Sequence, residues 1–203
     1  TFRFIRRGSD GQPSIEPQTD ATWETMASEL GVVPDNRVRA LVCVEGPTDV
    51  EALQYLSHAL HRADQTIIDL SSDRRVAFLV LGGGTLAHWV NKHYLENLGR
   101  PEIHIYDGDV SQYQAAIDNV NRRTDGSWGV LTTKREIENY LHPDAIQQGL
   151  GCSVSIGDHD DVPALVAASS GWNTRTAKKK LAQYAFPKMT ASQIKERDPS
   201  GEI

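Results

Sequence analysis

Short apolar runs alternate with amphipathic segments through the middle of the chain. Four runs predict β-strands: ALVCV (40–44), VAFLVL (76–81), EIHIY (102–106) and WGVL (128–131). The first run has no polar residue, which is typical of a strand covered on both faces of a parallel sheet. Between the runs, apolar residues recur at helical spacing, as Leu53, Leu56 and Leu60 do. This alternation predicts an α/β fold with a mainly parallel sheet flanked by helices, and we assign residues 38–141 to it.

Capping residues and glycine mark the boundaries of the predicted helices. Capping boxes predict helix starts at Thr48 with Glu51, at Ser111 with Gln114, and at Thr190 with Gln193. The helix after Ser111 should reach about Arg123, and another helix over 85–98 should end at Gly99.

Both ends of the chain differ from this central region. Residues 1–37 contain the strand-like TFRFIRR, a Gly/Pro/Ser-rich linker over 8–18, and a helix capped by Asp20 with Trp23, Met26 and Leu30 at helical spacing. We expect this part to end a preceding domain that the chain lacks. Residues 142–203 predict a helical C-terminal subdomain, with helices in HPDAIQQGL, over 174–185 and after Thr190. Residues 172–203 hold seven Lys or Arg against three acids, so this end is basic.

Composition narrows the class of protein. No apolar run is long enough to cross a membrane and no leader is evident, so we expect a cytoplasmic protein without a membrane partner. The net charge of -6 argues against a protein that coats DNA. Cys43 and Cys152 lack the spacing of metal ligands and are interpreted as reduced packing residues, and the seven histidines as structural or surface residues.

Carboxylates follow the predicted strands at the edge where ligands of open α/β sheets bind. Glu45 ends the first strand and Asp49 follows in the next helix, while Asp107 and Asp109 end the third. If the first and third strands are neighbours and the chain at Asp107 is extended, these side chains converge. Carboxylates that close together repel unless a cation lies between them, and Mg²⁺ or Mn²⁺ prefers such oxygen ligands.

A second acidic pair, Glu136 and Glu138, follows the fourth strand. In an extended chain both side chains face one way, whereas in a helix they splay apart. In the extended case they complete a second metal position. Two divalent cations on one carboxylate cluster suit in-line displacement at phosphorus.

Each acidic feature also has a simpler interpretation. Asp49 could serve only the first turn of its helix, Asp107 and Asp109 could form a turn around Gly108, and Glu136 and Glu138 could be solvated. The LGGG segment matches no phosphate-binding loop, and a tight turn explains it better. The AKKKL segment fits a solvated helix face beside Ala177, Leu181 and Tyr184, although its lysines could also contact backbone phosphates.

Together these motifs resemble the Toprim domain of topoisomerases, primases and several nucleases, over about residues 38–140. Glu45 in VEGPTD and the Asp107–Asp109 pair in YDGDV carry the likeness. VCVEGPTDVEAL, the LGGG turn and above all KREIENYLHPDAI resemble the OLD (overcoming lysogenization defect) family, in which an ABC-type ATPase precedes a Toprim nuclease.

The resemblance implies a metal-dependent DNA endonuclease with a role in phage defence and two Mg²⁺ or Mn²⁺ ions per site. It implies metal ligands at Glu45, Asp49, Asp107, Asp109, Glu136 and Glu138, with Glu45, Asp107 and Asp109 catalytic. It also implies a catalytic lysine from the last part of the chain: Lys188 is the residue we assign, and Lys178, Lys179 and Lys180, which we assign to DNA-backbone contact, are alternatives. ATP would act only through the absent ATPase domain, and the intact protein is expected to be a homodimer.

Two rival functions remain open. IYDGDV also resembles the nucleophile motif of haloacid dehalogenase-type phosphatases, although that motif follows the first strand of the core and here it follows the third. A non-catalytic regulatory module that binds metal only structurally is the other alternative.

Overall fold

The computed structural model describes residues 4–7, 12–16, 37–82, 86–92 and 95–203. Four parallel strands form its main sheet: β3 (Ala40–Val44), β4 (Val76–Val80), β5 (Glu102–Tyr106) and β6 (Trp128–Leu131). Their order is β4-β3-β5-β6, so the first and third predicted strands are neighbours. The predicted α/β fold is confirmed, and its sheet and flanking helices are consistent with a Toprim-like fold.

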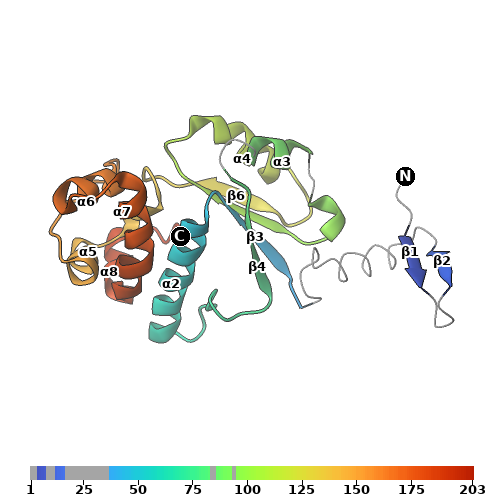
Figure 1. Cartoon of the computed structure of the whole chain (residues 1–203), viewed down its shortest axis with the longest axis horizontal. Helices are drawn as coiled ribbons and strands as arrows, with labels where there is room; N and C mark the ends of the chain where they lie inside the picture. Colours follow the sequence, from blue (N-terminus) through green and yellow to red (C-terminus); the bar gives the residue numbers. More distant parts are fainter. Residues whose placement is uncertain (1–3, 8–11, 17–36, 83–85, 93–94) are drawn as a thin grey trace.

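Helices cover both faces of the sheet (Figure 1). The helix α2 (Pro47–Ala63) lies on one face, and α3 (Leu86–Lys92) and α4 (Gln114–Asn121) lie on the other. Side chains of β3 alternate between the two faces: Val42 and Val44 join the core with α2, and Cys43 joins the core with α3 and α4. This burial on both sides is the physical reason that the β3 sequence has no polar residue.

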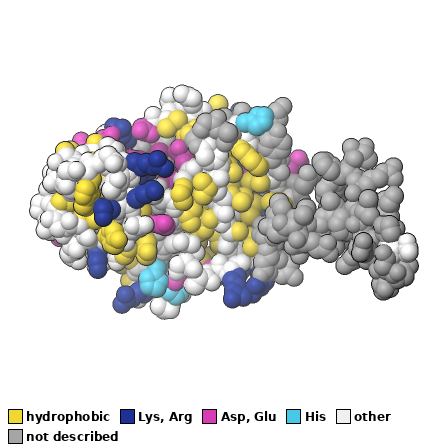
Figure 2. Space-filling view, viewed as in Figure 1, with side chains coloured by type: hydrophobic (Ala, Val, Ile, Leu, Met, Phe, Trp, Pro, Cys, Tyr) yellow, Lys and Arg dark blue, Asp and Glu magenta, His cyan; other side chains and the backbone are white. Residues whose placement is uncertain are grey.

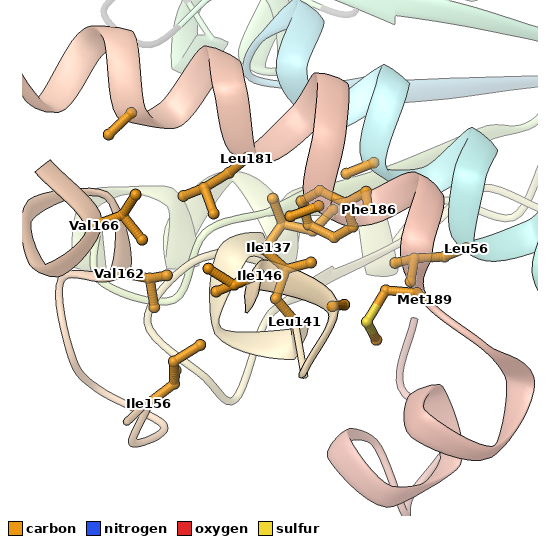
Figure 3. Packing of buried hydrophobic residues seen from close by; sticks show 14 of the residues in the cluster. Leu56, Ile137, Leu141, Ile146, Ile156, Val162, Val166, Leu181, Phe186 and Met189 are labelled. Atoms are coloured by element: carbon orange, nitrogen blue, oxygen red, sulfur yellow. The ribbon is translucent and has the colours of Figure 1, made fainter. Parts of the chain in front are cut away.

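The C-terminal part is helical, as predicted. Its elements are α5 (Pro143–Leu150), α6 (Val162–Ser170), α7 (Thr174–Lys180), the π-helix η5 (Leu181–Ala185), the 3-10 helix η6 (Phe186–Lys188) and α8 (Ala191–Arg197). They share one hydrophobic core with α2, in which Leu56, Ile146 and Phe186 lie together (Figure 3). The packing therefore ties the basic end of the chain to the sheet.

The π-helix η5 changes which residues of this segment face the core. The sequence places Ala177, Leu181 and Tyr184 along one side, but Tyr184 is 48% exposed while Ala185 is fully buried. A π turn adds a residue to the helical turn and shifts the positions that follow. Close packing accompanies it, since a Cβ on Gly149 of α5 would lie 2.1 Å from the Tyr184 carbonyl oxygen.

The N-terminal prediction needs a correction. Strand β2 (Pro13–Glu16) lies inside the segment predicted as a linker and pairs antiparallel with β1 (Phe4–Arg7). Ile5 lies opposite Ile15, so the strand-like first segment has its partner a few residues away. The predicted helix after Asp20, and most of the LGGG turn, lie outside the described residues.

Two predicted helices have different bounds, and one helix was not predicted. The helix expected over 85–98 is α3 followed by the 3-10 helix η2 (Glu96–Leu98), which Gly99 ends in the left-handed conformation. Residues Ser111–Tyr113 form a 3-10 helix, η3, and α4 begins only at Gln114. The helix α6 was not predicted, because its run of small and apolar residues has little helical periodicity.

The capping box at Thr190 and Gln193 is confirmed. The Thr190 hydroxyl accepts from the Gln193 N–H, and the Gln193 side chain accepts from the Thr190 N–H at 3.0 Å. Replacing Thr190 by alanine leaves the Gln193 N–H without its side-chain acceptor, and we expect the free energy of unfolding to fall by about 1 kcal/mol. Urea unfolding measures this change. The Ser192→Ala variant, altered at an exposed position of the same helix, is the control and should unfold like the wild type; equal stability of both variants contradicts the cap.

Candidate metal centre

Glu45 and Asp107 lie close enough to act on each other electrostatically where β3 and β5 end. The Asp107 N–H donates to Glu45 Oε1 at 3.0 Å, and the Tyr113 hydroxyl donates to Glu45 Oε2 at 3.1 Å. Because β3 and β5 are hydrogen-bonded neighbours, the residues that follow them share one edge of the sheet. The convergence of Glu45 and Asp107 expected from the sequence is therefore present.

Asp49 lies at the same edge and also begins α2. The predicted box of Thr48 with Glu51 is wrong: Gly46 is the N-cap residue, and its N–H donates to Asp49 Oδ2 at 2.8 Å. Asp49 is nevertheless only 7% exposed, and the positive charge of Lys178 acts on it. Asp49 thus serves its helix and faces the site at the same time.

The turn after β5 is held against the segment that follows β6. Gly108 N–H donates to Thr132 Oγ1 at 2.9 Å, and Asp109 N–H donates to the Arg135 carbonyl at 3.1 Å. A Cβ on Gly108 would lie 2.0 Å from the Thr132 carbonyl oxygen. The absence of a side chain at Gly108 allows this approach, which brings Asp107 next to the Glu136 segment.

Asp107 and Asp109 do not point the same way. The chain turns at Gly108, so the rule for extended chain that places residues i and i+2 on one face does not apply. Asp107 faces inward and accepts from the Ile137 N–H at 3.1 Å. The Asp109 carboxylate is 41% exposed and forms an ion pair with Arg135 at 3.4 Å.

Glu136 and Glu138 come together on the 3-10 helix η4 (Ile137–Tyr140). Lys178 Nζ lies 3.1 Å from Glu136 Oε2 and 3.3 Å from Glu138 Oε2. The chain is extended at Glu136, the N-cap residue, and helical from Ile137, so neither of the two predicted cases describes the whole segment. Both glutamate side chains nevertheless reach the same ammonium.

Asn139 and Arg197 hold this turn, and no pattern in the sequence singles out either residue. Asn139 is fully buried; its Oδ1 accepts from the Glu136 N–H at 3.1 Å, and its Nδ2 donates to the carbonyls of Gly157 and Asp160. Arg197 donates to the Asn139 carbonyl at 2.6 Å. These contacts depend on residues 18 to 58 positions apart, which no local pattern reveals.

We refer to Glu45, Asp49, Asp107, Glu136 and Glu138 as the acidic cluster. Burial is the first cause that raises the pKa of four of its members: Glu45, Asp49, Asp107 and Glu138. The pKa of Asp107 rises to about 8, because neighbouring carboxylates add to burial while Lys178 opposes them. In turn, the carboxylates raise the pKa of Lys178 above its ordinary value, although burial opposes this rise.

The four candidate lysines occupy different surroundings. Lys178 contacts the acidic cluster, whereas Lys179 and Lys188 are exposed. Lys180 lies over the rings of Trp172 and Tyr184, with its Nζ 4.8 and 5.4 Å from the ring centroids. Successive residues of an α-helix point about 100° apart, so Lys178, Lys179 and Lys180 do not form one flat patch. Figure 2 shows basic side chains beside acidic ones near the place where α7 meets the sheet in Figure 1.

The acidic cluster fits a hard divalent cation. Its donors are carboxylate oxygens, the ligands that Mg²⁺ and Mn²⁺ prefer. Glu138 is 1% exposed, and within the described part of the chain neither of its carboxylate oxygens accepts a hydrogen bond. A buried carboxylate without hydrogen bonds is costly unless a cation lies beside it. In this structure the Lys178 ammonium is that cation.

A second group of possible metal ligands lies inside the sheet. The Cys43 sulfur and side-chain atoms of Glu102 and His104 lie within 4.8 Å of one another, and all three residues are buried. These groups already have protein partners. His104 contacts Glu102 through Nε2 at 2.8 Å and Tyr106 through Nδ1 at 2.5 Å, and Glu102 forms an ion pair with Arg123 at 2.9 Å.

The charges of this second group argue for a structural network. Burial alone raises the pKa of Glu102, but His104 and Arg123 outweigh it, so the pKa lies below its ordinary value. Burial also raises the pKa of the Cys43 thiol, which disfavours the thiolate that a metal needs. Cys43 and Cys152 are both free and buried, in agreement with their interpretation as reduced packing residues.

Comparison of the sequence with models of known families, with curated proteins and with solved structures found no match. Among the helices that the structure describes, none has the length and apolar character needed to cross a membrane.

Proposed function

We propose that this chain is the catalytic region of a metal-dependent DNA endonuclease of Toprim type. The observation that carries the proposal is the position of the acidic cluster: its carboxylates gather at the carboxyl ends of neighbouring parallel strands, around one lysine. Glu45 and Asp107 would hold one divalent cation, with Asp109 beside it, and Asp49, Glu136 or Glu138 a second. When bound, Mg²⁺ or Mn²⁺ supplies activation of water and stabilisation of charge on the leaving 3′ oxygen.

The protein's own groups would orient these ligands and hold the substrate. Tyr113 and the Asp107 N–H fix the Glu45 carboxylate, and the Ile137 N–H fixes that of Asp107. Lys178, rather than Lys188, is the lysine that the described structure brings to the acidic cluster, so we propose it for stabilising negative charge on phosphate oxygens. Lys179 and Lys180 remain our proposal for contact with the DNA backbone, which would not require a specific base sequence.

The proposal also includes a further domain and a second subunit in the intact protein. An ABC-type ATPase domain before this chain would make cleavage depend on ATP, and the intact protein would act as a homodimer. Both statements follow from the likeness to the OLD family and are separate from the chemistry of the acidic cluster.

Cleavage of supercoiled plasmid tests the proposed function. We expect nicking or linearisation with Mg²⁺ or Mn²⁺ and none with EDTA. Replacing a residue that only hydrogen-bonds to a metal ligand typically lowers activity about 10- to 100-fold, and replacing the ligand itself should lower it more. Asp107→Asn and Asp109→Ala should therefore each slow cleavage by about a hundredfold or more. Asp118→Asn, on the exposed face of α4, is the matched control and should cleave like the wild type.

The same assay separates the rival functions. Metal-dependent cleavage that persists in Asp107→Asn would contradict the proposed site. Trapping of an aspartyl-phosphate on Asp107 would favour the phosphatase. Cation binding without either reaction would favour the regulatory module.

A further inference from the structure

The Lys178 ammonium lies among three carboxylates. Its Nζ is 3.1 Å from Glu136 Oε2, 3.3 Å from Glu138 Oε2 and 4.0 Å from Asp107 Oδ2. These carboxylates come from the ends of β5 and from η4, and α7 brings the lysine to them from a part of the chain about 40 residues away. The ammonium therefore occupies the space that a cation shared by these three groups would need.

One further observation indicates that this space can take a different cation. Both oxygens of the buried Glu138 lack hydrogen bonds within the described residues, so only charge holds the Lys178 side chain to Glu138. Lys178 donates a hydrogen bond to Glu136 Oε2 instead, at 3.1 Å. Mg²⁺ needs oxygen ligands at about 2.0–2.1 Å, closer than the ammonium holds them, so the carboxylates must draw in when a divalent cation replaces the ammonium.

We propose that Lys178 competes with the second divalent cation for the acidic cluster, and that binding of nucleic acid draws the lysine away and admits that cation. The proposal rests on the proposed function for the metal centre, but not on cleavage. An ammonium and a divalent cation repel, so they do not share three carboxylates at these distances. The Lys178 side chain is flexible and 31% exposed, so its head can leave while α7 stays in place.

A phosphate of bound DNA gives the displaced ammonium a new partner. Nucleic acid and the second cation then favour each other's binding, as linkage requires when both select the same position of one side chain. In the absence of nucleic acid, Lys178 would keep the site from holding its full set of cations.

Binding of Mn²⁺, measured by calorimetry and by the loss of the free Mn²⁺ signal in electron paramagnetic resonance, tests this proposal without any cleavage. We expect Lys178→Met to bind the second Mn²⁺ about tenfold or more tightly than the wild type. A short DNA duplex, shown by gel to remain intact during the measurement, should raise the Mn²⁺ affinity of the wild type and leave that of Lys178→Met nearly unchanged. Lys195→Met, an exposed lysine of α8 to which we assign no contact with metal or DNA, is the matched control and should behave like the wild type.

Thermal melting shows whether the Lys178 variants are folded. Removal of the ammonium leaves buried carboxylates without a counter-charge, so Lys178→Met should melt below the wild type in EDTA and gain more stability from Mn²⁺. Lys178→Gln, which keeps a hydrogen-bond donor, should also melt below the wild type in EDTA, but by less than Lys178→Met, and should likewise gain more stability from Mn²⁺ than the wild type.

Weaker or equal Mn²⁺ binding by both Lys178 variants, in folded protein, overturns the competition. If neither variant nor the wild type binds Mn²⁺, the cation site itself is overturned and the competition with it. Tighter binding in the Lys178 variants without plasmid cleavage by the wild type leaves the competition supported and counts against the endonuclease alone.

Discussion

Replacing Gly108 by alanine should lower the free energy of unfolding by about 3 kcal/mol and disrupt the metal centre. The new Cβ would lie 2.0 Å from the Thr132 carbonyl oxygen and 2.7 Å from that of Lys134. Both neighbours are backbone atoms, so the two segments must move apart. This movement breaks the Gly108 bond to Thr132 and the Asp109 bond to Arg135, and it separates Asp107 from the turn that carries Glu136.

Urea unfolding and Mn²⁺ binding together test this expectation. The matched control is Gly46→Ala, because a Cβ there would lie 3.6 Å from Thr48 Oγ1 and 3.7 Å from Asp49 Oδ2, which are ordinary contacts. As an N-cap residue Gly46 is still preferred over alanine, so we expect the control to lose about 1 kcal/mol or less. Gly108→Ala with the stability and Mn²⁺ affinity of the control would show that the close approach does not hold the site together.

Replacing Arg123 by methionine should lower the free energy of unfolding by about 3 kcal/mol, because Glu102 keeps its buried charge and loses its ion-pair partner. Arg123 Nη1 lies 2.9 Å from Glu102 Oε2, and Nη2 donates to the Val90 carbonyl at 3.0 Å. Glu102 is 2% exposed, so water cannot take the place of the guanidinium. The loss is limited by His104, which keeps its contact with Glu102.

A double variant distinguishes charge from packing at this site. Arg123→Met with Glu102→Gln removes both charges and should recover a large part of the lost stability. The exposed neighbour Arg122→Met is the matched control and should unfold within about 0.5 kcal/mol of the wild type. If Zn²⁺ instead raises the melting temperature of the wild type and this effect disappears on replacing Cys43, the group binds metal and our structural interpretation is wrong.

The strands of the sheet can be predicted from the sequence because their signals are local. Each of the four predicted strands forms, and those at 40–44, 102–106 and 128–131 have their predicted bounds. A strand that is buried on both faces needs apolar residues at successive positions, and such a run can be recognised in the sequence alone. The capping box at Thr190 is likewise local and correct, whereas the Thr48 box failed because Gly46 and Asp49 offered a start two residues earlier.

The candidate site could be predicted only in part from the sequence, and the rest depended on the tertiary structure. Glu45 and Asp107 were placed at one sheet edge by strand pattern together with the assumption that β3 and β5 are neighbours, which the sheet order confirms. The predicted orientation of Asp109 was wrong because Gly108 turns the chain. Glu136 and Glu138 both reach Lys178, although the chain is extended only at Glu136. Nothing in the local sequence separated Lys178 from Lys179, Lys180 and Lys188.

The sequence by itself determined the four strands of the main sheet, most of the helices and the strand ends that carry carboxylates, because these follow from the periodicity of short segments. Only the tertiary structure decided which of those carboxylates meet and which lysine lies among them. The direction of a side chain at a turn, and the contact of α7 with residues about 40 positions earlier, are set by packing across the fold. Packing of this kind depends on shapes and distances between segments that the order of residues alone does not express.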